Sequence, residues 1–173
     1  MGTGRDLGLL MLRLGVGASY FIRGAKELFG WFGGGGAGDT VETTSALGST
    51  SGERNVRLSG VLETGGGALL ALGLATGTVG AALTGNMIVA SSVQTPNGSL
   101  NISEGYELPV AYALVGTTLA LAGPGRFSVD HLIGGSLNRP WMRALALIGA
   151  LASAAYLIAT RSAVLAERDD DED

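Results

Sequence analysis

The chain of 173 residues is long enough for one domain, and 46% hydrophobic residues, 15% charged residues and a mean hydropathy of +0.36 are typical of an integral membrane protein. It has no cysteine, which excludes disulfides, thiol chemistry and cysteine-ligated iron–sulfur clusters, and its one histidine excludes bis-histidine haem ligation by this chain alone. The net charge of −4 comes largely from the C-terminal run ERDDDED, so it says little about the apolar part.

This composition predicts an all-α, polytopic membrane helix bundle. The N-terminus has no signal-peptide cleavage pattern, so the first apolar segment is expected to be retained as a helix. Residues 1–166 are expected to form a single domain, and 167–173 an acidic, disordered tail that folding does not require. The candidate membrane spans are residues 7–29, 58–75, 78–93, 109–122 and 141–160.

The first segment carries a charged residue, Arg13, inside its apolar run. Helical spacing places Arg13, Gly17, Tyr20, Gly24 and Glu27 on one face. A charged side chain at membrane depth faces the bundle interior or water, which favours a buried Arg13. In the alternative interpretation the helix begins later and Arg13 extends to the membrane surface.

A long loop is expected after the first segment, because the tetraglycine 33–36 has too much backbone entropy to continue a helix. Asp39 and Glu42 have the spacing of a capping box, which predicts a short helix over 40–47. We expect the whole loop, residues 33–57, to be mobile.

The glycine-rich run from residue 59 to residue 90 forms the second and third segments and contains a single carboxylate. Helical spacing places Ser59, Glu63, Gly66, Gly73 and Gly77 on one stripe, so this carboxylate shares a face with small residues. Such a face is expected to meet another helix rather than lipid.

Further polar residues lie in the third segment and after the fourth. Asn86 can bond across helices or satisfy itself locally. The fourth segment is expected to end at Gly123-Pro124-Gly125, and Ser128 to cap a short amphipathic helix at the membrane surface. His131 in that helix fits an interfacial residue better than a metal ligand, because the chain has no second histidine or cysteine.

Three stretches of the sequence resemble the DoxX family of small membrane proteins, relatives of the DoxD subunit of thiosulfate:quinone oxidoreductase. They are residues 13–33, 63–90 and 112–134, and the turn GPGR-x-S-x-D is the most specific piece. The resemblance implies a DoxX-like four-helix core, to which this chain adds a fifth, C-terminal transmembrane helix. The expected location is a prokaryotic plasma membrane.

The resemblance further implies an integral membrane subunit associated with quinone-linked or redox-stress oxidoreduction, in the setting of a respiratory chain. The family has no agreed catalytic residues, so those of this chain are unknown. The expected ligand is a non-covalently bound quinone, and the expected partners are lipid and other subunits or a second copy, with no nucleic acid. The alternatives are a non-catalytic accessory or assembly subunit of a larger complex and a small-solute carrier, although no inverted repeat supports the carrier.

The candidate ligand residues are Arg13, Tyr20, Glu63 and Asn86, which are expected to line a polar pocket between the first two segments for a quinone headgroup or a small anion. Equally, Arg13 and Glu63 are expected to lie within salt-bridge reach as a structural pair. No metal site is expected. Structural roles are expected for Gly66, Gly73, Gly77, Gly123, Pro124, Gly125 and Arg126.

Overall fold

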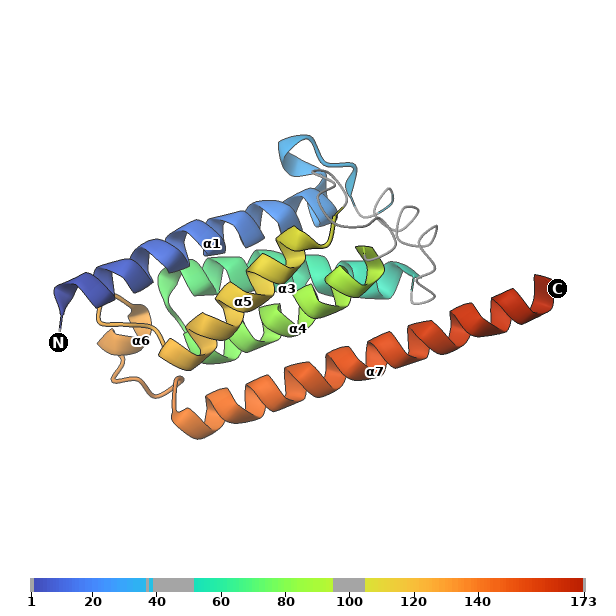
Figure 1. Ribbon diagram of the computed structural model, residues 1–173. Coiled ribbons are helices and arrows are strands. Elements are labelled where there is room, and N and C mark those ends of the chain that lie inside the picture. The colour runs from blue at the N-terminus through green and yellow to red at the C-terminus, as the bar shows by residue number, and fades with distance from the viewer. Residues whose placement is uncertain (1, 37, 39–51, 95–104, 173) are drawn as a thin grey trace.

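The computed structural model of the protein describes residues 2–36, 38, 52–94 and 105–172, and within this part of the chain all regular secondary structure is helical. The elements are α1 (Thr3–Phe29), η1 (Trp31–Gly33), α3 (Gly52–Leu72), α4 (Thr76–Gln94), α5 (Glu107–Ala122), α6 (Val129–Leu132) and α7 (Pro140–Glu172) (Figure 1).

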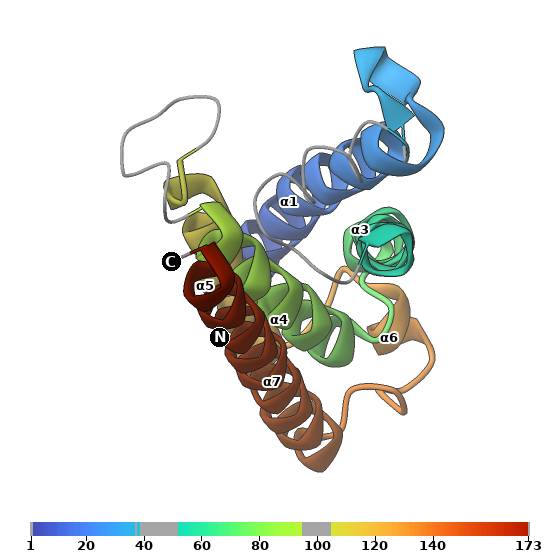
Figure 2. The ribbon, with the colours of Figure 1, turned by 90° about the vertical axis from the view of Figure 1, so that its right-hand side faces the viewer.

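The long helices form an up-and-down bundle. Figure 1 shows α1, α4 and α7 running in one direction and α3 and α5 in the other. In both views α1 lies along α3, while α4 lies along α5 and α7 (Figure 2). We call the two ends of the bundle the α6 end, where α1 begins, and the η1 end, where α1 ends. Helix α4 is the central element and contributes the largest share of buried positions.

Small residues allow α1 and α3 to pack backbone against backbone. A Cβ atom on Gly24 would lie 2.5 Å from the backbone nitrogen of Thr64, and one on Gly17 would lie 2.7 Å from the carbonyl oxygen of Gly67. Both distances are shorter than any real contact of a Cβ atom. Glycine is therefore required at this interface, as in many helix pairs within membranes.

The segment between α5 and α7 closes the α6 end by capping α4 from a distance. The backbone N–H groups of Ala75 and Thr76 donate to the two carboxylate oxygens of Asp130, at 2.9 Å and 3.1 Å. The N–H of Gly77 donates to Oδ1 of Asn138 at 3.1 Å. These N–H groups begin α4 and have no partner within the helix, so two side chains more than 50 residues away take the place of a local cap.

Several residues for which the sequence predicts a structural role lie at this closed α6 end. Gly73, Gly123 and Gly125 have φ angles of 70°, 79° and 73°, which favour glycine. The N–H of Arg126 donates to Oδ1 of Asp6, which ties the loop after α5 to the start of α1. Ser128 caps α6 as predicted, since its hydroxyl accepts from the N–H of His131.

Each of the five segments expected to be helical contains a long helix, and the main difference concerns the C-terminus. Helix α7 continues to Glu172, whereas the sequence predicts an end near Thr160 and a disordered tail over 167–173. No glycine or proline follows Gly149, so nothing in the covalent backbone stops this helix. The short helix expected at 40–47 lies outside the described residues, as does most of the loop predicted to be mobile.

One helix in the described part of the chain, Pro140–Ala163 within α7, is long and apolar enough to cross a membrane. Only 6% of its most apolar window is buried within the molecule. Helix α5 is a shorter apolar helix. Charged side chains in α1, together with the glycine and polar residues of α3 and α4, keep those helices below the hydropathy of the segment Pro140–Ala163 of α7.

Candidate functional site: a buried polar cluster of α1, α3 and α4

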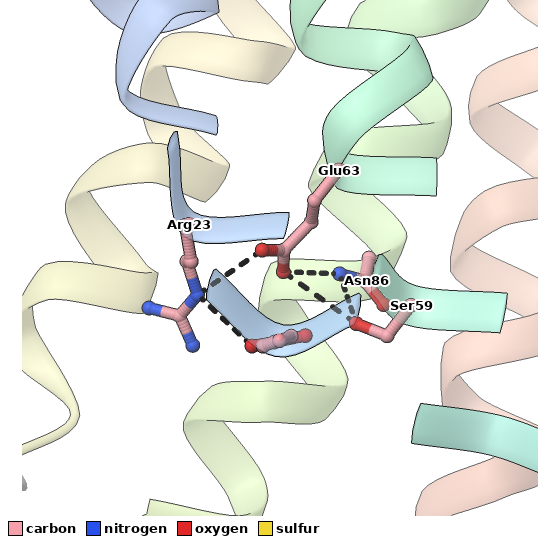
Figure 3. Close-up of polar contacts among 5 residues, drawn as sticks. Arg23, Ser59, Glu63 and Asn86 are labelled. Atoms are coloured by element: carbon pink, nitrogen blue, oxygen red, sulfur yellow. Dashed lines mark hydrogen bonds and ion pairs between the residues drawn. The ribbon is translucent and has the colours of Figure 1, made fainter. Parts of the chain in front are cut away.

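Glu63 lies near the middle of α3 and points between the helices, with 1% of its surface exposed. The side-chain amide of Asn86 on α4 donates to its Oε1 at 2.9 Å, and the hydroxyl of Ser59, one turn earlier on α3, lies 3.5 Å from the same oxygen (Figure 3). Asn86 also donates to the Ser59 hydroxyl, at 3.0 Å. Two neutral groups therefore fix the orientation of the carboxylate through one of its oxygens.

The other oxygen of Glu63 faces Arg23 of α1, whose Nε lies 3.2 Å from Oε2 (Figure 3). The same Nε lies 3.6 Å from Oε1 of Glu27, one turn further along α1. The Nε and the Oε2 are close enough for an ion pair, but their geometry does not make a hydrogen bond, and both atoms are buried without one. One guanidinium thus serves two carboxylates.

Tyr20 adds a phenol to the cluster from the preceding turn of α1. Its side chain is fully buried, and its ring lies 5.0 Å from that of Tyr112 on α5. It is within electrostatic range of Glu63 and Arg23. The Tyr20 hydroxyl is buried and has no hydrogen-bond partner among the described residues. The cluster, defined here as Tyr20, Arg23, Glu27, Ser59, Glu63 and Asn86, therefore lies where the first four long helices meet.

Arg13 is fully buried, as predicted, but its expected pairing with Glu63 is wrong. Arg13 precedes Arg23 by ten residues, which is about 15 Å along α1. Because α3 runs antiparallel to α1, the contact of Gly24 with Thr64 sets Glu63 level with Arg23. Of the predicted stripe only Ser59 and Gly66 share a helix with Glu63, because α3 ends at Leu72, and the height at which Glu63 meets α1 differs from the expected one.

The side chain of Arg13 instead binds the loop that closes the α6 end. Its Nη2 donates to the carbonyl oxygen of Phe127, and the charge of Asp130 acts on its guanidinium. Its Nη1 occupies the space that a Cβ atom on residue 73 would fill, which explains a glycine at that position. Arg13 is therefore a structural residue of the α6 end and lies apart from the cluster.

The small residues expected on the Glu63 stripe meet several different elements. Gly66 packs against Val79 and Leu83 of α4, and Gly77 against Arg143 of α7. The residue after Gly66, Gly67, faces α1 instead, because consecutive helical residues point about 100° apart.

Sequence reasoning did not assign Arg23, Glu27 or Asp130 to any site. The i, i+4 spacing of Arg23 and Glu27 was a usable signal, since it predicts an ion pair on the face that also carries Tyr20. For Asp130 no local signal exists, because its partners lie more than 50 residues earlier in the chain.

The chemistry available in the cluster is hydrogen bonding and proton transfer. A phenol, a carboxylate and a guanidinium lie together in an apolar surrounding, where their interactions are weakly screened. The described residues contain no group of three or more histidine, cysteine or acidic side chains that could hold a metal ion.

Comparison with known proteins adds one finding. The DoxX family model matches residues 8–94, just over half of the chain. This region contains most of α1 and all of α3 and α4, and hence every residue of the cluster. No curated protein and no solved structure matches the chain.

Proposed function

This chain belongs to the DoxX family, and from that premise we propose that it is a multi-pass subunit of a prokaryotic plasma membrane which serves quinone-linked or redox-stress oxidoreduction. Its ligand site is the cluster around Glu63, and the ligand is a quinone headgroup. The observation that carries this proposal is the pair of buried polar atoms without a hydrogen bond, the Tyr20 hydroxyl and Oε2 of Glu63.

Large apolar side chains on the outside of the bundle support the membrane location. Met11 on α1, Leu114 on α5 and Ile148 on α7 are exposed, as the side chains of lipid-facing helices would be. Trp31 at the η1 end and Trp141 at the α6 end are also exposed. Tryptophan is enriched at both surfaces of a membrane, and η1 and the start of α7, which carry these residues, lie at opposite ends of the bundle (Figure 1).

The buried polar atoms fit the chemistry of a quinone. A buried hydroxyl without a partner costs about 1–3 kcal/mol, which a ligand carbonyl accepting its hydrogen bond would recover. A bound quinone supplies two-electron chemistry. Tyr20 would donate to a carbonyl oxygen, Arg23 would stabilise negative charge on the headgroup, and Glu63 would supply or take up a proton. Asn86 holds Glu63 for this role.

Electrons would have to come from another subunit. The chain contains no cysteine and therefore no thiol or cysteine-bound cluster of its own. The nearly unburied apolar helix α7 offers a surface on which such a subunit can pack. The same helix supports the second candidate function, an accessory subunit that holds a larger complex together and binds no ligand.

The test is to purify the protein in lipid nanodiscs directly from native membranes and to measure bound quinone by mass spectrometry. We expect quinone with the wild type and about a tenfold weaker affinity with Tyr20→Phe, which corresponds to one lost hydrogen bond of about 1.4 kcal/mol. Tyr156→Phe, on the exposed surface of α7, is the matched control and should bind as the wild type does. Co-purifying subunits without quinone would favour the accessory function instead.

A further inference from the structure

We infer that Glu63 and Glu27 together hold one exchangeable proton beside Arg23, so that the cluster is a proton-binding site shared by two carboxylates. The inference deepens the proposed function, because it relies on the membrane location of the cluster, but it does not depend on a quinone.

The first step is the balance of charge. If all three side chains are ionised, the charges of Arg23, Glu27 and Glu63 sum to −1. Glu63 has almost no contact with solvent, and in a membrane the surroundings of the cluster would be apolar. An uncompensated charge in such a place is costly, whereas one added proton makes the group neutral.

Among the described residues, the groups that act on Glu63 do not supply the missing positive charge. The charges that act on Glu63 are those of Arg23 and Glu27, and the groups that donate to it, Ser59 of α3 and Asn86 of α4, are neutral. The phenol of Tyr20, with Tyr112 of α5 beside it, is neutral as well. The compensating charge is therefore a proton.

The hydrogen bonds indicate where a proton can reside. Oε1 of Glu63 already accepts from Asn86 and Ser59, whereas Oε2 is buried and accepts no hydrogen bond. A proton on Oε2 converts that unused acceptor into a donor. The fully buried Tyr20 hydroxyl, which also lacks a partner in the described structure, is a second independent sign of unused hydrogen-bonding capacity at this point.

The proton exchanges with water through Glu27. The Glu27 side chain is 19% exposed, against 1% for Glu63, and it lies two residues before the end of α1 at the η1 end. A hydronium ion at that surface gives its proton to the carboxylate of Glu27, forms an O–H bond and leaves as water. Since Arg23 Nε lies within 3.6 Å of both glutamates, the proton can then be held by either carboxylate.

The experiment measures the C=O stretch of a protonated carboxylic acid by infrared difference spectroscopy, in H₂O against D₂O, with quinone-free protein in nanodiscs at neutral pH. We expect the wild type to show this band and the band to shift in D₂O. Glu63→Gln and Glu27→Gln should each abolish it, because the remaining carboxylate is then balanced by Arg23. Arg23→Gln should increase it about twofold, because both carboxyl groups then lack a cation.

The controls separate this result from misfolding and from quinone binding. Glu107→Gln, at the start of α5, should leave the band unchanged, and circular dichroism should show equal helix content in all variants. A wild type without the band, a band that does not shift in D₂O, or a band that survives Glu27→Gln overturns the shared proton. Protein that binds no quinone but follows this pattern refutes only the proposed ligand, whereas quinone binding without the band refutes only the shared proton.

Discussion

The energetic partner of Arg13 is predicted to be Asp130, because the two residues meet in the closure of the α6 end. Arg13→Met removes the donor to the Phe127 carbonyl and the cation whose charge acts on Asp130. Asp130→Asn leaves one side-chain oxygen for the two N–H groups of Ala75 and Thr76 and leaves Arg13 without a counter-charge. Both residues are fully buried, so each single change leaves the other charge buried without compensation, which lowers the unfolding free energy.

The magnitudes follow from burial. Leaving a buried charge without its compensating charge costs up to about 3–5 kcal/mol of unfolding free energy, the range for directly paired charges, and hydrogen bonds to a charged acceptor contribute about 1.5–3 kcal/mol each. The double variant removes both charges, so we expect a coupling energy of about 1–3 kcal/mol between Arg13 and Asp130. Between Arg13 and Glu63, whose partner Arg23 lies about 15 Å from Arg13 along α1, it should stay below about 0.5 kcal/mol.

The assay is a double-mutant cycle on reversible unfolding in mixed micelles titrated with dodecyl sulfate, followed by circular dichroism. One cycle combines Arg13→Met with Asp130→Asn, and the matched cycle combines Arg13→Met with Glu63→Gln. A larger coupling in the second cycle, or strict additivity in the first, would refute the assignment of Arg13 to the α6 end.

Three further predictions concern the packing and the C-terminus. Gly24→Ala should lower the unfolding free energy by about 1–3 kcal/mol, because the added Cβ meets the backbone of Thr64. The control Gly15→Ala, where nothing lies within 4 Å, should not lower it. Equal effects of the two variants would contradict the close α1–α3 contact. Asn86→Leu should cost about 1–3 kcal/mol in the same titration, because Glu63 loses its nearest donor; an unchanged midpoint would show that this bond does not hold the carboxylate. Truncation after Glu167 should leave the thermal midpoint in detergent unchanged, because a block of like charges repels rather than packs; a large drop would mean that the tail docks.

The sequence predicts the positions of the long helices and favours a buried Arg13, but it does not predict which groups the buried charges contact. Apolar runs broken by glycine and proline locate helices, and a stripe of small residues indicates which face meets a neighbour. Neither signal fixes the height at which two helices meet. The expected pairing of Arg13 with Glu63 therefore rests only on their opposite charges. The antiparallel packing of α1 and α3 instead sets Glu63 level with Arg23.

The capping role of Asp130 could not be derived from sequence for a related reason. The groups that donate to Asp130 are backbone N–H groups. Every residue except proline carries one, so the residue types in the sequence do not indicate which N–H groups Asp130 binds. The sequence predicts the helix end at Gly123 and the Ser128 cap within the GPGR-x-S-x-D turn, but not a role for its aspartate. Its physical role, as the cap of a helix from an earlier part of the chain, appears only in three dimensions.

That distant cap has a consequence for the order in which the protein can assemble. During synthesis α4 is made before the segment that carries Asp130 and Asn138, so its first N–H groups have no protein acceptor until α5 and the following loop have been added. Backbone N–H groups at a helix start need an acceptor, and until the C-terminal segment is made only water or another molecule can supply it. Residues 8–94, which the family model matches, therefore do not include the side chains that cap α4, and the start of this helix acquires its final hydrogen bonds only when the C-terminal half has been made.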